Sequence, residues 1–493
     1  MDIGFCSGSY TLASIAAANE ECINWYRETV ESQSPFAVAK AYGGTSYQTK
    51  AWLKPTPGLQ LFGTALPGVP RGTCWTGQRM FTVAGGSLVE LAADGTQTVR
   101  GTVANDGNAA SLCYSLIEVF IVSGGRAYDY NLGSNTLLDV TNQMAGTPIQ
   151  CRYSDGFFIV LNSNGKFQFS NPLDGTTWQG IFVNEVSVFP DIPISILTAH
   201  RELWIFGPQH IQPYYDSGSD NLFDVISGAL IETGTCSTFS PCVVDNAPFW
   251  ISQDERGSAI AFRAQGYTPQ RISTHAVETD LATRNLGNLV SYAYQDGGHS
   301  FWVLYVPGSQ WSWVYDVAEN LWHKRASWTG TGWAPHWSWS HEFAFGMHLV
   351  GDWNSSNIYQ MAQPQGVGGV YSFVTDNGTA IRRLRRSATT INEMEWIYYP
   401  NITLDFETGL GPQPPLQDGN YNPRDPQAML RWSDDRGHKW SNEYLIDCGQ
   451  AGEYRRRAIR WRCGRSRYRV WEVSVTDPIP WNLIGAYVGE KAA

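Results

Sequence analysis

The sequence predicts an all-β chain built mainly as a β-propeller, with an additional antiparallel β domain at its C-terminal end. Three observations support this prediction: a recurring apolar strand phrase, the turn residues that follow it, and a change of character beyond residue 370. Strand units repeated at intervals of roughly 40–50 residues are typical of propellers, in which each repeat is one small sheet. We expect six or seven blades and favour seven.

The recurring phrase is three or four bulky apolar residues followed by a polar turn and a second short strand. Successive copies begin 39, 38, 46, 46, 52 and 46 residues apart. The seven copies are Met80–Val83, Val119–Val122, Phe157–Val160, Leu203–Phe206, Phe249–Ser252, Phe301–Leu304 and Met347–Val350. Gly-Gly or Asn-Gly pairs follow the first three copies, and such pairs favour hairpins because tight turns need a positive φ.

The distribution of Pro, Gly and apolar residues divides the chain into three segments. Residues 1–70 are predicted to form an N-terminal arm and entry segment, with at most a short helical turn within 16–30. Residues 71–370 are predicted to form the propeller, with a short helix near 278–292. Residues 371–493 alternate polar and apolar side chains and are predicted to form the C-terminal β domain, with a Pro/Gly-rich loop at 409–426.

The composition indicates a chain that buries a large apolar surface and carries few charges. Aromatic residues make up 13% of the 493 residues, charged residues make up 16%, and the net charge is −11. Residues 1–369 hold 17 Lys and Arg against 30 Asp and Glu, whereas residues 370–493 hold 17 against 15. Most of the chain should therefore repel nucleic acid, while its C-terminal part is locally basic.

No sequence motif predicts a cofactor, a metal site or a catalytic residue. The nine Cys residues include no C-x-x-C pair, and we expect them to be reduced and mostly buried. His336 and His341 lie among tryptophans and are interpreted as packing residues. Phosphate-binding, zinc-protease and nucleophile-elbow motifs are missing. The N-terminus does not resemble a secretory signal and no apolar run is long enough for a membrane span, so we expect a soluble protein made in a cytosol.

Residues 433–440 fit S-x-D-x-G-x-x-W, the Asp-box pattern of a hairpin turn that also occurs in sialidases and other propeller proteins. Asp435 is expected to accept backbone N–H bonds, Gly437 to supply a positive φ, and Trp440 to pack beneath the turn that Ser433 opens. We assign these four residues a structural role. A looser version of the pattern, Asp174–Trp178, follows the third copy of the repeat.

Eight arginines lie within 15 residues near the C-terminus and alternate with aromatic residues. They are Arg455, Arg456, Arg457, Arg460, Arg462, Arg465, Arg467 and Arg469. Arginines among aromatic rings suit phosphate contacts and stacking on bases. The alternative is a strand pair whose outer face pairs with acidic residues of its own or a neighbouring subunit. We favour this alternative because the rest of the chain is acidic, and we take Arg456, Arg457, Arg460, Arg462, Arg465 and Arg467 as candidate interface residues.

Several phrases, taken in their order along the chain, form a pattern that extends from the N-terminal to the C-terminal part. The N-terminal part contributes Glu21–Arg27 and Pro57-Gly58-Leu59. The central part contributes Phe249–Ser252, Gly257–Ile260, Pro269–Thr274, Trp302–Pro307, Trp313–Asp316 and Trp322. The C-terminal part contributes Ser433–Trp440 and the strand Arg456–Arg462. Together these phrases resemble the tail hub or nozzle protein of short-tailed phages, also called the packaged-DNA stabilisation protein family. Longer inserts and a fuller Asp box distinguish this sequence from the family pattern.

The resemblance implies a structural protein of the virion tail, made in the cytoplasm of a host bacterium, and not an enzyme. A homohexamer would extend the DNA channel below the portal and its adaptor protein. It would help to retain packaged DNA, and would let double-stranded DNA pass through its lumen without sequence recognition. Tail spikes or tail fibres would dock outside, and a tail needle or plug would close the tip. Arg456, Arg457, Arg460 and Arg462 would then bridge subunits or face the adaptor.

Three other functions fit the sequence. The first is a carbohydrate-active or carbohydrate-binding propeller, similar to a sialidase or a lectin, since a glycosidase needs only two facing carboxylates. Asp254 with Glu255, or Asp352, are candidates, although we interpret them as ordinary turn residues. The second is a cellular propeller that acts as a protein scaffold. The third is a nucleic-acid-binding module that uses the arginine-rich strands.

Overall fold

A computed structural model of the chain describes residues 3–6, 20–33, 47–186, 189–218, 222–254, 257–367, 370–411 and 426–489. Within these ranges the regular structure is almost entirely strand, with one α-helix, α2 (His275–Ala282), and two single 3-10 turns, η1 (Thr141–Gln143) and η2 (Gly180–Phe182). The predicted all-β fold is confirmed. Residues 412–425 of the predicted Pro/Gly-rich loop, and Glu255, lie outside the described residues.

The chain forms two compact units, and both are discontinuous in sequence. The propeller unit consists of residues 61–318 and 335–361, and the sandwich unit of residues 1–60, 319–334 and 362–493. This grouping differs from the three consecutive segments expected from the sequence. The described part of the first 60 residues folds with the C-terminal part, because Trp25 and Leu53 are fully buried in the sandwich core. The indole N–H of Trp25 also donates to the carbonyl of Trp481 at 2.8 Å.

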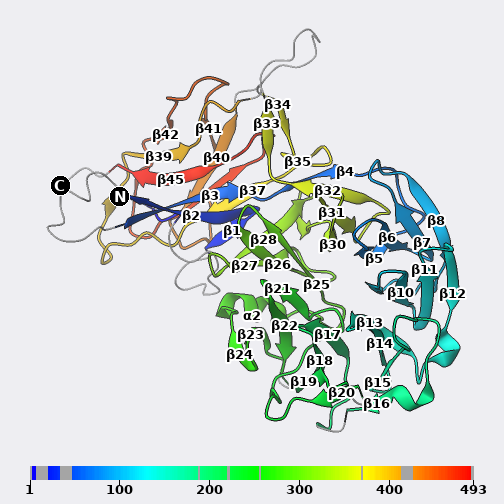
Figure 1. The fold of residues 1–493 in the computed structure, drawn as a ribbon. Coiled ribbons are helices and arrows are strands. Elements are labelled where there is room, and N and C mark those ends of the chain that lie inside the picture. Colours follow the sequence, from blue (N-terminus) through cyan, green and yellow to red (C-terminus); the bar gives the residue numbers. More distant parts are fainter. Residues whose placement is uncertain are drawn as a thin grey trace. The chain divides into compact units, whose positions relative to one another are not determined.

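Seven antiparallel sheets succeed one another along the described part of the propeller unit (Figure 1). The first sheet contains β5 (Pro70–Trp75), β6 (Met80–Ala84), β7 (Ser87–Leu91) and β8 (Gln97–Thr102). The second contains β9 (Ser111–Tyr114), β10 (Glu118–Ser123), β11 (Arg126–Asn131) and β12 (Thr136–Asp139). The third contains β13 (Pro148–Ser154), β14 (Phe157–Asn162), β15 (Lys166–Phe169) and β16 (Val183–Glu185). The next two are β17 (Ser195–Ala199), β18 (Glu202–Phe206), β19 (Ile211–Asp216), β20 (Phe223–Val225); and β21 (Cys242–Val244), β22 (Ala247–Gln253), β23 (Ala259–Gln265), β24 (Thr268–Arg271). The last two contain β25 (Val290–Asp296), β26 (His299–Tyr305), β27 (Ser312–Asp316); and β30 (Ser338–Ala344), β31 (Met347–Asp352), β32 (Ile358–Ala362).

The seven copies of the sequence phrase occupy the second strand of each successive sheet. These strands are β6, β10, β14, β18, β22, β26 and β31. The second strand is hydrogen-bonded on both sides and covered on both faces, so most of its residues are buried on both faces. In β6 and β10 every residue is buried. A strand with two covered faces favours a continuous apolar run. This explains why the same phrase recurs once per sheet.

Hydrogen bonds link the first strands of neighbouring sheets into a closed ring. The Ala110 N–H donates to the Arg71 carbonyl at 2.8 Å, and the Ile196 N–H donates to the side-chain oxygen of Gln150 at 2.6 Å. The ring closes between the seventh sheet and the first. The indole of Trp339, on β30, donates to the carbonyl of Pro70, on β5, at 2.7 Å. Each sheet therefore has its first strand beside the centre of the ring.

The segment that enters the propeller also holds the last sheet. The Phe62 N–H donates to the carbonyl of Ile358 at 2.9 Å, and the Leu66 N–H donates to that of Ser356 at 2.7 Å. Phe62 and Leu66 pack against Leu349 in one apolar cluster. Residues from the two ends of the propeller sequence thus share one core, which stabilises ring closure by burial of apolar surface.

A buried carboxyl on β11 makes the stability of the propeller depend on pH. Asp129 is 1% exposed, and its Oδ1 has no hydrogen-bond partner in the described structure. Burial, aided by the charges of Glu118 and Asp174, raises the pKa of Asp129 to about 8. An aspartate in the unfolded chain has a pKa near 3.9. The folded state therefore keeps a proton that the unfolded state releases, and this contribution to stability falls as the pH rises from about 4 to 8.

We expect Asp129→Asn to raise the free energy of unfolding at pH 8 by at least about 1.4 kcal/mol, the equivalent of one pKa unit, and to change it little at pH 4. Urea unfolding of the full chain at both pH values measures the difference. Asp224→Asn, on a more exposed strand of the same unit, is the control for the loss of a carboxylate as such. An equal effect of Asp129→Asn on the free energy of unfolding at both pH values would contradict a raised pKa of Asp129.

Two sheets face each other in the sandwich unit. One has the order β2 (Trp25–Gln33), β3 (Tyr47–Pro55), β45 (Leu483–Val488), β39 (Asn401–Phe406), β42 (Ala458–Trp461). The other has the order β28 (Leu321–Trp328), β1 (Glu21–Ile23), β37 (Arg383–Arg386), β44 (Val470–Val475), β40 (Gln427–Ser433), β41 (Tyr444–Asp447). Both contribute buried side chains to one apolar core, including Ile402 and Leu404 from the first, and Trp471 and Val473 from the second. This layered packing is that of a β-sandwich.

The remaining described strands are short. They are β4 (Gly58–Leu61), β29 (Trp333–Pro335), β33 (Gln365–Val367), β34 (Val370–Ser372), β35 (Thr375–Asp376), β36 (Thr379–Ala380), β38 (Ile397–Tyr398) and β43 (Arg465–Ser466). The expected helical turn within residues 16–30 is wrong for its described part, because residues 21–23 and 25–33 are strands that pair with β37 and β3. The expected helix near 278–292 overlaps the end of α2.

Candidate functional site

The arginine-rich segment of the sandwich unit contains buried, partly buried and exposed arginines, and these do different work. Arg469 is a core residue, with 1% of its side chain exposed. Its guanidinium binds both carboxylate oxygens of Asp434, at 2.6 and 2.9 Å, and lies 4.4 Å from the ring centre of Tyr399. A bidentate pair stacked on an aromatic ring is well suited to hold two strands together.

Arg456 and Arg460 both have partners within the sandwich unit. Arg456 forms an ion pair with Asp447 at the end of β41. Arg460 on β42 is half-buried, and its guanidinium lies 4.1 Å from the ring centre of Tyr444. Arg456 is thus an exposed arginine of the segment that pairs with an acidic residue of its own unit.

The other arginines of the segment are exposed and have no carboxylate within ion-pair distance in the described structure. They are Arg455, Arg457, Arg462, Arg465 and Arg467. Arg462 adopts a φ of 61°, next to Trp461, whose side chain is 60% exposed. Exposed arginine and tryptophan side chains are the residue types that protein interfaces favour. The interface role of Arg457, Arg462, Arg465 and Arg467 stays a prediction.

Arg465 and Arg467 stack on one indole. Their guanidinium carbons lie 4.6 and 4.9 Å from the ring centre of Trp396, whose side chain is 46% exposed. Arg465 also donates to the hydroxyl of Tyr398 at 3.2 Å. The two-stranded ladder of β38 and β43 fixes this geometry, because it pairs Ile397 with Ser466 and Tyr398 with Arg465. We call Trp396, Arg465 and Arg467 the open stack.

A second stack of the same kind lies on the same unit and includes its own carboxylate. The guanidinium groups of Arg386 and Arg431 lie 4.9 and 4.7 Å from the ring centre of Trp440. Both bind Glu472, at 2.6 and 2.5 Å, and Glu472 is 1% exposed. We call these four residues the closed stack. It shows how this chain neutralises two arginines on one indole.

The Asp-box residues form a hairpin turn. Ser433 accepts the Gly437 N–H at 2.8 Å and donates to Asp435 at 2.7 Å, and Asp435 accepts the Lys439 N–H at 2.7 Å. Gly437 has a φ of 96°. Trp440 at the end of the turn is the platform of the closed stack. The turn thus also positions an indole for two arginines, which the sequence pattern did not indicate.

Sequence reasoning missed the partners of the arginines. Trp396 and Tyr398 precede the arginines they contact by about 70 residues, and Arg386 precedes Glu472 by 86. Strand pairing brings these residues together, and no local pattern records it. One signal was available in the sequence: Glu472 is the only charged residue of an otherwise apolar and serine-containing strand, Val470–Val475, all of which is buried in the structure.

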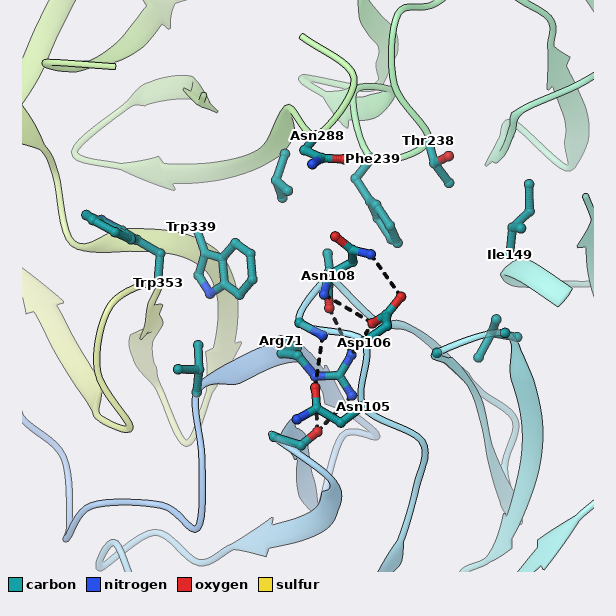
Figure 2. Close-up of a pocket in the computed structure, with 18 of the residues that line it drawn as sticks. Arg71, Asn105, Asp106, Asn108, Ile149, Thr238, Phe239, Asn288, Trp339 and Trp353 are labelled. Carbon is teal, nitrogen blue, oxygen red and sulfur yellow. Dashed lines mark hydrogen bonds and ion pairs between the residues drawn. The ribbon is translucent and has the colours of Figure 1, made fainter. Parts of the chain in front are cut away.

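The propeller unit contains a pocket of about 830 Å³ near the centre of the ring (Figure 2). Its labelled lining includes Trp339 and Trp353 on one side, the loop of Asn105, Asp106 and Asn108, and Thr238, Phe239 and Asn288 from later sheets. Its charged lining side chains are Arg71 and Asp106, which bind each other at 3.0 Å. The pocket therefore does not present the two facing carboxylates that a glycosidase needs.

Arg71 holds the rim of this pocket in place (Figure 2). Its side chain is 1% exposed and donates to the carbonyls of Gly85, Ala104 and Asn108 at 2.7, 2.8 and 2.9 Å. It also donates to the Ser123 hydroxyl at 2.7 Å. Burial lowers the pKa of Arg71 from its ordinary value. With its donors engaged by protein atoms, Arg71 is a structural residue.

The histidines and cysteines of the described structure form no metal site. The rings of His341 and His348 lie within hydrogen-bond distance, at 2.9 Å, and burial lowers the pKa of His341 to about 3. His336 instead bonds Ser338 at 2.6 Å. No group of three or more His, Cys, Asp or Glu residues suits a metal ion in the described ranges, and the nine cysteines are free thiols. Among the same residues, no helix has the length and hydropathy to cross a membrane.

Two family profiles match the sequence. The family described as Bacteriophage P22 Gp10, beta-propeller, matches residues 36–365, and the family described as Bacteriophage P22 Gp10, beta-sandwich, matches residues 384–490. The matches confirm the predicted combination of a propeller with a C-terminal β domain. Comparison with curated protein sequences gave no match.

Solved structures of propellers resemble the chain weakly. The WD40 β-propeller domain of Doa1 is 11% identical, with 62% of this chain and 97% of that chain covered and a TM-score of 0.40. The β-propeller domain of Cps50 (Swd1) from Myceliophteria thermophila is 8% identical, with 62% and 99% covered and a TM-score of 0.42. YCF48 from Cyanidioschyzon merolae is 10% identical, with 62% and 98% covered and a TM-score of 0.42. At TM-scores below 0.5 these likenesses support no inference about function.

Proposed function

The chain belongs to the family of bacteriophage P22 Gp10, a tail nozzle and stabilisation protein of short-tailed phages, and we propose that six copies of it form a nozzle ring in the tail. The ring extends the DNA channel below the portal and its adaptor protein and helps to retain the packaged DNA. One observation carries the proposal: both domains of a single phage tail protein match this chain, in order, over most of its length.

The partners follow from this position in the tail. The adaptor protein lies above the ring, tail spikes or fibres dock outside it, and a needle or plug closes its tip. A closed ring of identical subunits needs heterologous contacts, in which two different faces of the chain meet. The exposed arginines of the sandwich unit provide one such face.

The charge of the chain suits a channel through which DNA slides. The propeller unit holds 24 Asp and Glu against 11 Lys and Arg. Lys and Arg contacts to phosphates would hold DNA in place, and their scarcity leaves it free to move. Double-stranded DNA then passes through the lumen without sequence recognition.

A phage with a nonsense codon in the gene for this chain tests the function. We expect its particles to package DNA and then lose it, and to lack tail spikes or fibres, as measured by electron microscopy and by the DNA content of purified particles. The wild-type chain supplied from a plasmid should restore DNA-filled, infectious particles. DNA-filled and infectious particles made without the chain would contradict the proposal.

The same complementation tests the candidate interface. Arg457 and Arg462 are exposed and have no carboxylate within ion-pair distance in the described structure, so their reversal should leave the fold intact. We expect the Arg457→Glu/Arg462→Glu variant to be soluble and folded but to restore at least about tenfold fewer infectious particles, because the reversed charges repel an acidic partner. Circular dichroism checks the fold. Full restoration would exclude these two residues from the assembly contacts.

A further inference from the structure

The open stack on the sandwich unit has the geometry of the closed stack but lacks its carboxylate. In both, two guanidinium groups lie between 4.6 and 4.9 Å from the centre of one indole. In the closed stack, Glu472 binds both arginines. In the open stack, the described structure places no Asp or Glu within 4 Å of Arg465 or Arg467. The open stack is therefore an anion-binding arrangement without its anion.

Two of the other arginines that stack on rings of the sandwich unit bind a carboxylate, whereas Arg436 and Arg460, stacked on Tyr468 and Tyr444, have none within ion-pair distance in the described structure. Arg469, stacked on Tyr399, binds Asp434. Arg382 lies 4.4 Å from the ring centre of Trp328, with Glu443 at 4.0 Å. Carboxylates thus neutralise the stacked arginines in both cases, as Glu472 does in the closed stack. Two guanidinium groups held on one ring repel each other, and a carboxylate between them offsets this repulsion while it accepts directed N–H bonds.

The surroundings of the open stack are those of a protein interface. Trp396 and Tyr398 are 46% and 59% exposed, and Met394 is 54% exposed. Large exposed apolar residues beside arginines mark interaction sites, and tryptophan, tyrosine and arginine supply most of the binding energy at interfaces. The ladder of β38 and β43 holds the arginines in place before any partner binds, which reduces the entropy lost on binding.

The propeller unit of the same chain offers the complementary charge. Its 24 acidic residues against 11 basic ones contrast with 21 against 23 in the sandwich unit. Asp94 and Glu232 are examples of exposed propeller carboxylates that have no cation within ion-pair distance in the described structure. A second copy of this chain therefore carries an excess of the group that the open stack lacks.

We propose that the open stack of Trp396, Arg465 and Arg467 binds a carboxylate on the propeller unit of a neighbouring copy of this chain. The contact is heterologous, since a basic face of one copy meets an acidic face of the next, and such contacts can close into a ring. This inference rests on the proposed nozzle function and names the partner of one of its interface faces.

Self-association of the purified full chain tests the inference by analytical ultracentrifugation. We expect the wild type to associate in about 50 mM salt and to associate less in about 500 mM salt, because salt screens exposed charge pairs. The Arg465→Glu/Arg467→Glu variant should associate at least about 30-fold more weakly. Trp396→Ala, which removes the platform at constant charge, should weaken association in the same direction.

A matched variant controls for net charge. Lys439→Glu/Arg455→Glu changes the charge of the same unit by the same amount, at exposed residues that do not stack on a ring in the described structure, and it should associate like the wild type. Arg465→Lys/Arg467→Lys keeps the charge but loses the planar groups, and it should be intermediate. Equal association of the Glu double variant and the wild type would overturn the inference, as would a wild type that stays monomeric at about 100 μM in low salt.

Mixing tests the direction of the contact. A folded Arg465→Glu/Arg467→Glu chain still offers its acidic propeller, so it should cap wild-type assemblies and lower their average size when added at equal concentration. Absence of capping, with the variant folded, would argue against a heterologous contact. Binding of a DNA duplex by the wild type that the Glu variant loses would assign the open stack to phosphate and overturn the inference. A tail defect in the nonsense phage without self-association of the chain would leave the proposed function intact and reject only this contact.

Discussion

Replacement of Trp471 by alanine is expected to destabilise the sandwich unit by about 3–5 kcal/mol, the usual cost when a large aromatic side chain is removed from a core. Trp471 lies on β44, is fully buried and belongs to the apolar core between the two sheets. Its ring centre lies 5.4 Å from that of Tyr399 and 5.6 Å from that of Trp432. Urea unfolding of the full chain, followed by far-ultraviolet circular dichroism, measures the loss.

Trp461 provides the matched control, because it is a tryptophan of the arginine-rich segment that precedes Trp471 but is 60% exposed. Trp461→Ala should change the free energy of unfolding by less than about 0.5 kcal/mol. Similar effects of the two substitutions would show that the sheets do not pack on Trp471.

The second large effect is expected at the carboxylate of the closed stack. Glu472→Gln keeps the shape of the side chain but removes the negative charge of this buried residue, so Arg386 and Arg431 lose their shared ion-pair partner. Removal of one member of a buried ion pair costs about 3–5 kcal/mol, and the partial exposure of the two arginines, 18% and 31%, places this case at the lower end, about 3 kcal/mol. The same urea experiment measures it.

Glu443→Gln is the control for this prediction. Glu443 lies 4.0 Å from Arg382, and 41% of its side chain is exposed. An exposed pair contributes less than about 1 kcal/mol, so this variant should remain close to the wild type. A loss at Glu472 no larger than the loss at Glu443 would mean that the closed stack does not depend on its carboxylate.

The propeller could be predicted from sequence because its signal is local and repeated. Each copy of the apolar phrase lies on a strand with neighbours on both sides, and in Val119–Val122 every residue is buried. The Gly-rich turn that follows, Gly124-Gly125, has positive φ at both residues, as the hairpin requires. Strand identity and hairpin turns both follow from residues close together in the chain.

The composition of the sandwich unit could not be predicted from sequence in the same way. Glu21–Ile23 pairs with Leu384–Arg386, and Leu53 pairs with Leu483. Partners more than 300 residues apart leave no periodic signal in the sequence. The residues of a strand also do not indicate which distant strand will pair with its edge. The N-terminal segment therefore appeared to be a separate arm.

The arginine-rich segment could be recognised from sequence, but which of its arginines are buried and which are exposed could not. Sequence alone gives Arg465 and Arg469 the same appearance, whereas the structure buries the second against Asp434 and leaves the first on the surface. The aromatic partners come from strands elsewhere in the sequence, so only the folded chain separates structural arginines from those available to a partner.

We propose that identical copies of this chain form a hollow ring through which DNA passes. Electron microscopy of the virion tail, with particles aligned without imposed symmetry, tests it most directly. We predict six copies of the propeller and sandwich units around an open channel wide enough for a DNA duplex. A tail in which the chain is a single copy, or a set of copies with no channel between them, would contradict the account.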